Sequence, residues 1–139
     1  MLNNLLADLV VEYHKLQNFH WYVKGSDFFN AHAKLEELYN GINGAIDEVG
    51  EHILMIGEKP LASLNEFIKA SHIQEADMNF KSSKDIYNEV IQDFDYLLES
   101  VKKIKEDADQ QNNPLISSLM DNYIGEFSKN LWMLRQAFQ

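Results

Sequence analysis

The sequence predicts an all-α protein folded as a four-helix bundle. Its 139 residues include only 6 Gly and 2 Pro, a composition that favours long helices over turn-rich β structure. Hydrophobic residues make up 45% of the chain and recur at steps of three and four in four long stretches, the period of a helix with one buried face. The length is that of one domain with a single core, so we expect residues 1–139 to form one domain.

The first two helices are expected over residues 2–23 and 28–57. Gly25, Ser26 and Asp27 interrupt the first pattern, and Gly57 and Pro60 end the second. The loop between them is short, so the two helices should pack antiparallel. The predicted buried positions are Leu2, Leu5, Leu6, Leu9, Tyr13, Leu16, His20 and Val23 in the first helix, and Leu35, Leu38, Ile42, Ala45, Ile46, Val49, Ile53 and Ile56 in the second.

A long crossover follows the second helix. Within it, Ser63 and Glu66 have the spacing of a capping box and predict a short helix carrying Leu64, Phe67 and Ile68, after which residues 71–81 are expected to form a loop. One long crossover is typical of the ferritin-like variant of the four-helix bundle. The predicted fold is therefore a ferritin-like bundle with a short extra helix between helices two and three.

The last two helices meet at a sharp break. The third should begin near Ser82 or Ser83, and Asn113 and Pro114 suit the N-cap and first position of the fourth. Their predicted buried residues are Ile86, Val90, Phe94, Leu97, Val101 and Ile104, then Leu119, Tyr123, Phe127, Leu131, Leu134 and Phe138.

Charge and composition exclude several classes of function. The absence of Cys rules out a disulfide framework, a thiolate zinc site and a cysteine nucleophile. A formal net charge of -10 argues against electrostatic binding to nucleic acid and suits a protein that attracts cations, although acidity can also serve solubility alone. The N-terminus has no basic leader and no stretch has the length of a membrane span, so we expect a cytoplasmic protein.

Four residues carry the types of side chain that bind metal ions. His20 lies about one turn before the break at Gly25 and His32 about one turn after it, so an antiparallel hairpin brings them to the same level. Asp47 and Glu51 are four residues apart and share one helix face. Imidazole and carboxylate ligands suit iron, with Zn, Mn and Co as competitors.

Distance separates these two pairs within one chain. Fifteen residues of helix place His32 about 22 Å from Asp47, too far for one metal ion. Either the pairs are unrelated or the site forms between subunits. A two-fold dimer with antiparallel second helices would bring His32 of one copy to Asp47 of the other, and Gly41 and Gly44 near the midpoint would permit close approach.

Less specific interpretations stay open at this point. A histidine on an apolar face is commonly a core residue, paired acids are commonly a solvated surface, and the two glycines could pack against the chain's own helices. The chain has no Glu-x-x-His motif, so a di-iron site in the bundle core is not expected. His14, His52 and His72 are interpreted as surface residues, and Phe19, Trp21, Tyr22, Phe28 and Phe29 as packing residues.

The sequence resembles the Dps family of mini-ferritins over essentially the whole chain. LQNFHWYVKG at residues 16–25 and FFNAHAKLEELY at 28–39 match the family's signatures around its two ligand histidines. DEVGE at 47–51 matches its carboxylate pair, GEKPLASLNEF at 57–67 resembles its crossover, and LWML at 131–134 resembles its last helix.

The resemblance implies a ferroxidase that stores iron in a dodecameric shell and protects against oxidative stress. It implies centres made of His20 and His32 from one subunit and Asp47 and Glu51 from its two-fold mate, with Glu36 as an accessory ligand. It also implies that Trp21 lies near the centre and accepts oxidising equivalents, and that hydrogen peroxide is preferred to dioxygen as oxidant.

Two departures from the family pattern concern charge. His52 stands where an Arg is frequent, and QNNPLISS at 111–118 stands where many members place pore-lining acids, with Asp107, Asp109 and Asp121 nearest. Family members that bind DNA often use a basic tail. The first basic residue here is Lys15, so strong DNA binding is not expected. A nucleoid-protecting DNA binder with incidental metal sites is the alternative hypothesis. A helical interaction module is the third hypothesis.

Overall fold

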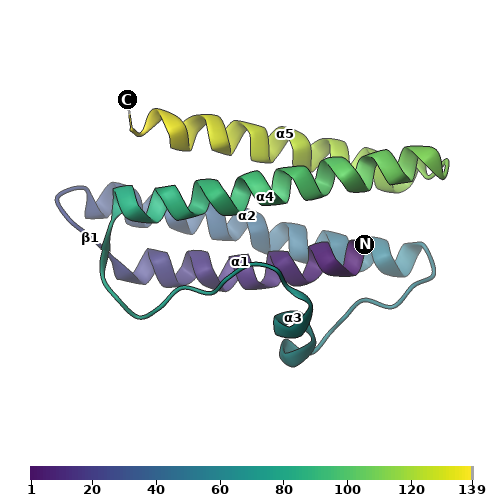
Figure 1. Ribbon diagram of the computed structural model, residues 1–139, viewed down its shortest axis with the longest axis horizontal. Coiled ribbons are helices and arrows are strands. Elements are labelled where there is room, and N and C mark those ends of the chain that lie inside the picture. The colour runs from purple at the N-terminus through teal and green to yellow at the C-terminus, as the bar shows by residue number, and fades with distance from the viewer. Residues whose placement is uncertain (139) are drawn as a thin grey trace. The chain divides into compact units, whose positions relative to one another are not determined.

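The computed structural model describes residues 1–138, which form helices, two strands of two residues each and the loops between them. In chain order the elements are α1 (Leu2–Tyr22), β1 (Val23–Lys24), α2 (Phe28–Met55), α3 (Leu64–Ala70), β2 (Lys81–Ser82), α4 (Ser83–Gln110) and α5 (Pro114–Gln136) (Figure 1). The chain divides into two compact units, residues 2–87 and a unit made of Met1 and the residues from Asn88 onward, so α4 begins in the first unit and continues through the second.

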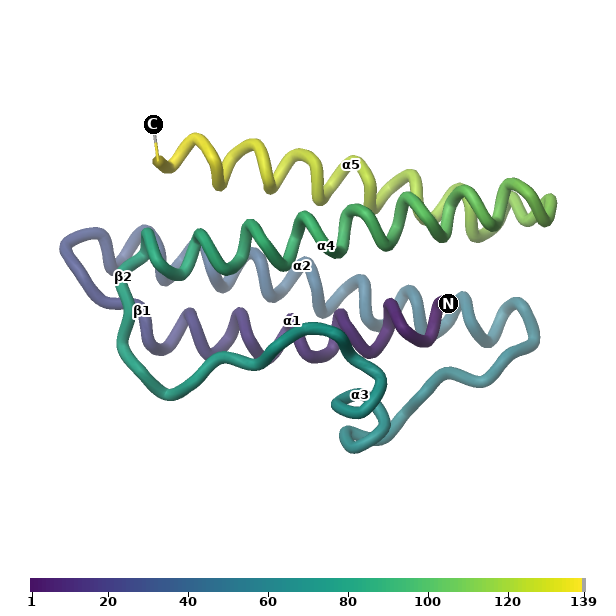
Figure 2. Tube along the Cα trace, viewed as in Figure 1, coloured from purple at the N-terminus to yellow at the C-terminus, as the bar shows by residue number. Residues whose placement is uncertain are grey.

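The first unit is built on an antiparallel hairpin of α1 and α2, as predicted (Figure 2). Gly25 makes the turn possible because its φ of +129° is a conformation that residues with a Cβ rarely adopt. Its carbonyl accepts a hydrogen bond of 3.1 Å from the amide of Phe28 at the start of α2.

Burial along the hairpin follows the predicted faces with a few exceptions. Tyr13, Ile46 and Ile56 are only half-buried, whereas the other predicted positions are buried. The charged residues Asp8 and Glu12 of α1 are also buried, which the sequence pattern did not indicate. One helix face therefore does not account for the burial of α1.

The crossover is held along α1 by polar contacts. The Asp8 carboxylate accepts hydrogen bonds from the Ser71 hydroxyl at 2.9 Å and the His72 amide at 2.7 Å. The Asn18 amide group donates to the carbonyl of Asp77 at 2.9 Å. These contacts explain how a long segment with little regular structure keeps a fixed course beside α1 (Figure 2).

A parallel pair of strands closes the end of the crossover. Val23 pairs with Lys81, in β1 and β2 respectively, and the hydroxyl of Ser83 donates to the Asp27 carboxylate at 2.6 Å. The sequence did not predict these strands, because two residues are too few to show a period of two.

The predicted short helix in the crossover is confirmed with its cap. Ser63 is the N-cap of α3, its hydroxyl accepts from the Glu66 amide, and the Glu66 side chain accepts from the Ser63 amide. The apolar side chains of Leu64 and Ile68 are exposed on this helix.

The second unit contains most of α4 and all of α5. Asn113 caps α5 by accepting from the Ile116 amide, and Pro114 is its first residue, as predicted. The rings of Phe94 and Phe127 pack edge to face at 5.2 Å. Among the residues predicted to be buried, Phe138 is exposed, because α5 ends at Gln136, before the ring could join the buried face.

The six predicted positions of α4, from Ile86 to Ile104, are all buried. Among residues 1–138, no helix combines the length and the apolar character that a membrane span requires.

Candidate metal centre

His20 and His32 lie against each other beside the turn that joins α1 to α2. Their imidazole rings are stacked, with centroids 3.6 Å apart and planes 15° from parallel. Each residue also binds the other's main chain: Nδ1 of His20 lies 2.7 Å from the carbonyl oxygen of His32, and Nδ1 of His32 lies 2.8 Å from that of His20. The predicted meeting of the two histidines is thus confirmed, with a reciprocity that no sequence pattern could indicate.

The two hydrogen bonds determine which ring nitrogen is available. A carbonyl oxygen can only accept, so Nδ1 carries the proton in both rings. In a neutral imidazole Nε2 then has a free lone pair. Metal-binding histidines in proteins are commonly oriented in this way, by a carbonyl that accepts from the nitrogen not bound to the metal.

The surroundings of the two rings restrict their movement. Phe28 stacks on His32 with ring centroids 4.9 Å apart, and Tyr39 places an edge against His20 at 5.3 Å. Oε1 of Glu36 lies 3.7 Å from Nε2 of His20, so this carboxylate lies beside the free nitrogen. Burial and the Glu36 carboxylate raise the pKa of Tyr39 above its ordinary value.

Asp47 and Glu51 form a second cluster farther along α2. Both side chains are exposed. The pKa of Glu51 is raised, first by a hydrogen bond with the Asp47 side chain and then by the negative charge of that group. The shift means that the negative charge of Glu51 is disfavoured beside that of Asp47, and a cation bound there would relieve the repulsion.

The fold does not bring the histidine pair and the carboxylate pair together within one chain. Along α2, the fifteen residues between His32 and Asp47 span about 22 Å. Among the described residues, no group of three or more His, Asp or Glu side chains is arranged to hold a metal ion. The predicted ligands therefore do not form one site within the described chain.

The glycines at the middle of α2 face open space. A Cβ added to Gly41 or Gly44 would meet no other described atom within 4 Å, apart from the helix's own nearby backbone. The interpretation that they pack against the chain's own helices is therefore wrong. The neighbouring Asn40 and Asn43 are also exposed, so this side of α2 has no covering element within residues 2–87.

Two aromatic residues near the histidines are exposed, which contradicts their interpretation as packing residues. Trp21 is 62% exposed and Phe29 is 83% exposed, whereas Phe19 is buried and Tyr22 and Phe28 are half-buried. An aromatic side chain suggests packing by its type, but residue type alone does not decide whether the fold covers it.

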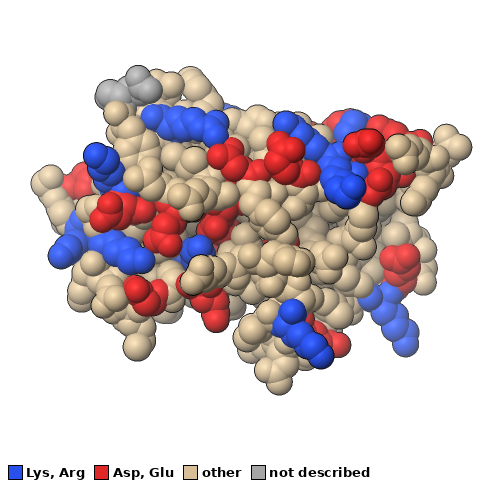
Figure 3. Space-filling model, in the orientation of Figure 1, with Lys and Arg blue, Asp and Glu red and all other residues tan. Residues whose placement is uncertain are grey.

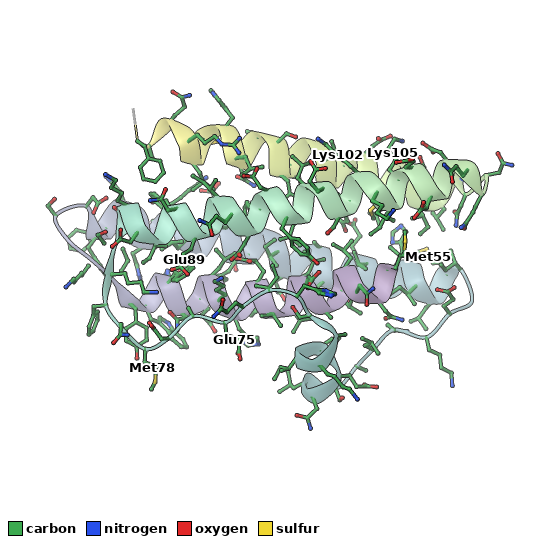
Figure 4. The ribbon with its side chains drawn as sticks, in the orientation of Figure 1. Met55, Glu75, Met78, Glu89, Lys102 and Lys105 are labelled. Carbon is green, nitrogen blue, oxygen red and sulfur yellow. The ribbon has the colours of Figure 1, made fainter. Side chains whose placement is uncertain are left out.

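A second polar cluster, which the sequence did not indicate as a unit, lies at the start of α5. A cavity of about 550 Å³ there is lined by Asp109, Asn112, Asn113, Pro114, Ser117, Ser118 and Asp121. Lys105, labelled in Figure 4, is a residue of α4. Its Nζ lies 3.0 Å from the Asp121 carboxylate and 3.7 Å from that of Asp109. The pKa of Lys105 is raised, first by its hydrogen bond to Asp121. In the sequence, only the i, i+4 spacing of Lys105 and Asp109 could have indicated part of this cluster, because residues four apart on a helix can form an ion pair.

Comparisons with known proteins agree with this architecture. The ferritin-like domain family matches residues 1–139. The chain is 35% identical over 134 residues to the DNA protection during starvation protein of Helicobacter pylori, covering 96% of this chain and 93% of that protein. It is 40% identical over 135 residues to DNA protection during starvation protein 2 of Bacillus anthracis, covering 97% and 92%.

Solved structures extend the similarity to the whole backbone. A Dps protein from Bacillus brevis superposes with a TM-score of 0.95 at 35% identity, covering 99% of this chain and 92% of that one. A Dps protein from Vibrio cholerae, described as a member of a broad superfamily of ferritin-like diiron-carboxylate proteins, gives 0.96 at 34% identity, covering 99% and 86%. The fold is therefore an all-α ferritin-like bundle, as predicted.

The chain belongs to the ferritin-like family and, within it, to the Dps proteins.

Proposed function

We propose that this chain is a ferroxidase subunit that oxidises Fe(II) to Fe(III) and stores the product inside a shell of identical subunits. Each centre takes His20, His32 and Glu36 from one subunit and Asp47 and Glu51 from its two-fold mate. Hydrogen peroxide is the proposed oxidant, and the protein consumes it together with ferrous iron under oxidative stress. The shell is proposed to be a dodecamer, as the family resemblance implies.

The observation that carries this proposal is the paired orientation of His20 and His32. Both Nδ1 atoms donate to main-chain carbonyls, so both Nε2 atoms are left as bases, and Glu36 stands 3.7 Å from one of them. Two oriented imidazoles with a carboxylate are half of a metal centre. The carboxylates that would complete it lie on the exposed side of α2.

The residues suit ferrous iron as a substrate and ferric iron as a product. Imidazole nitrogen binds Fe(II) well, and carboxylates stabilise the extra positive charge that develops on oxidation. Zn, Mn and Co would bind the same ligands and are expected to compete. Trp21, which is exposed on α1, is proposed to lie near the centre and to accept oxidising equivalents there.

The proposal is tested by iron oxidation with single variants. Stoichiometric Fe(II) is mixed with peroxide and the ferric absorbance is followed for wild type, His32→Ala and Asp47→Asn. Both variants should lose most of the rapid phase. His14→Ala and Glu37→Gln, which remove an exposed histidine from α1 and an exposed carboxylate from α2, should retain it.

Subunit sharing has a test of its own. His32→Ala and Asp47→Ala subunits are unfolded together and reassembled in equal amounts. Random pairing should restore about one quarter of wild-type sites, because half of the dimers are mixed and each has one intact site of two. No recovery, in particles of wild-type mass, would show that the ligands come from a single chain.

A further inference from the structure

A row of aromatic rings leads away from the histidine pair along the α1–α2 hairpin. Tyr39 meets His20 edge to face, with centroids 5.3 Å apart and planes at 84°. Tyr13 meets Tyr39 in the same manner at 5.6 Å and 83°, and its neighbour His14 lies 5.2 Å from Tyr13. Because His14 is exposed, the row connects the proposed metal centre to the solvent.

The two tyrosines are the only members of this row whose side chains are readily oxidised. A phenol gives up one electron when its proton can leave at the same time, which phenylalanine and imidazole do far less easily. Both tyrosines are half-buried, so neither side chain is sealed off from solvent, and the side chain of Tyr39 also has a hydrogen bond with that of Gln17. Trp21, by contrast, makes no ring contact with either histidine among the described residues.

We propose that Tyr39 and Tyr13 form a two-step electron relay that supplies one electron to the reaction at His20 and His32. This inference rests on the proposed function, since it assigns an electron source to the same centre. It applies when the centre holds a single ferrous ion, which can provide only one of the two electrons that a peroxide needs.

The electron balance shows what the relay contributes. One peroxide, one Fe(II), one phenol and one proton give two waters, one Fe(III) and one neutral tyrosyl radical. The O–O bond breaks, the ferrous ion and Tyr39 each lose one electron, and the phenol proton leaves to water. Without the phenol, the same ferrous ion and peroxide give Fe(III), hydroxide and a free hydroxyl radical.

The second step moves the radical away from the metal centre. Tyr39 regains an electron from Tyr13 and a proton from water, while Tyr13 loses its proton to water. The oxidising equivalent is then one ring farther from the ligand His20 and beside exposed His14. An external reductant can remove it there without reaching the centre.

The relay is tested by freeze-quench electron paramagnetic resonance of the assembled protein. Substoichiometric Fe(II) is mixed with peroxide, and ferric absorbance and spin-trapped hydroxyl radical are measured in the same samples. Wild type should show a tyrosyl signal whose splitting changes when the tyrosines are ring-deuterated. Tyr39→Phe should lose the signal, retain ferric formation and release more hydroxyl radical.

Further variants locate the radical and control for structure. Tyr13→Phe should keep a signal confined to Tyr39. Tyr22→Phe should leave the wild-type signal, because Tyr22 is on α1 but contacts Phe80 rather than a histidine. Trp21→Phe should also leave the tyrosyl signal, because any oxidation of Trp21 gives an indole radical, which ring deuteration of the tyrosines does not change. Circular dichroism and particle mass establish that each variant is assembled.

Distinct outcomes overturn the relay and the proposed function. Ferric iron formed without a tyrosyl signal in wild type, or a signal that persists in Tyr39→Phe, rejects the relay and leaves the ferroxidase intact. A signal lost only in Trp21→Phe would assign the electron to that residue instead. No iron oxidation by assembled wild type would reject the ferroxidase, and the relay with it.

Discussion

Each of the two histidines of the proposed centre is oriented by the main chain of the other. Nδ1 of His20 and Nδ1 of His32 both donate to a carbonyl oxygen, and this fixes the tautomer as well as the direction of each ring. The spacing around Gly25 was enough to predict that the residues meet. The spacing could not predict the tautomer, because the tautomer depends on the position of a carbonyl oxygen in the opposite helix.

Buried Asp8 shows how a single side chain can hold a long segment. It is 1% exposed and accepts hydrogen bonds from the hydroxyl of Ser71 and the amide of His72. Replacing it with Ala would leave both donors without that acceptor, and hydrogen bonds to a charged group contribute about 2 kcal/mol.

We therefore expect Asp8→Ala to lower the free energy of unfolding by about 2 kcal/mol. Urea unfolding at one fixed protein concentration measures this, since assembly contributes to apparent stability. Glu37→Ala, which removes an exposed carboxylate, is the control and should leave the midpoint unchanged. Equal midpoints for the two variants would contradict the role of Asp8.

At the scale of elements, the helices were predictable where a local signal marks their ends. The Ser63–Glu66 box and the Asn113–Pro114 pair mark the starts of α3 and α5. In each, the groups that cap the helix lie within a few residues of one another, so the sequence alone shows the cap. The strands β1 and β2 were not predictable, because each exists only through pairing with a distant segment.

The capping box of α3 predicts a dependence on pH. Hydrogen bonds from Ser63 and from the amide of Ala62 lower the pKa of Glu66 below its ordinary value. A group whose pKa is lower in the folded state stabilises that state above its unfolded pKa, and the contribution is lost as the pH falls through the folded pKa. Protection of α3 amides should therefore decrease on acidification to below about pH 4.

Hydrogen-exchange protection factors for α3 measure this effect. Glu66→Gln keeps a side chain that can complete the box but does not titrate, so its protection should stay level over the same range. Ser63→Ala should reduce protection at every pH, by about 1 kcal/mol. A wild-type protection factor that does not change with pH would argue that the Glu66 carboxylate contributes nothing.

At the scale of the whole molecule, the exposed side of α2 predicts how subunits pair. An added side chain at Gly44 meets nothing within the described chain, and helix propensity favours Leu over Gly by about 0.8 kcal/mol. Gly44→Leu should therefore keep its helix content. It should nevertheless weaken a two-fold contact in which another α2 approaches closely.

Sedimentation and light scattering give the particle mass that tests this pairing. Gly125→Leu on α5 is the matched control, since its added Cβ also meets nothing within 4 Å among the described residues. A Gly44→Leu particle with wild-type mass and wild-type iron oxidation would show that no helix approaches α2 at this point.

The charge of the molecule leads to a prediction about DNA. Its formal net charge is -10, and basic side chains lie among acidic ones on the face shown in Figure 3. Contacts to phosphate require clustered Lys and Arg, so we expect no retention of plasmid in electrophoresis at low salt, near neutral pH and without added metal. Retention under these conditions would favour the alternative of a DNA-binding protein.

The sequence by itself determined the helices, their caps, the hairpin that joins His20 to His32, and the distance that keeps Asp47 apart from them. These features depend on the spacing of residues along one or two helices, and the helical period of 3.6 residues converts that spacing into a face and a distance. Only the tertiary structure decided that Asp8 and Glu12 are buried, that Trp21 and Phe29 are exposed, and that Tyr13 and Tyr39 form a row with His20. Such contacts depend on which surfaces of separate helices meet, and a pattern within one helix cannot specify its neighbour.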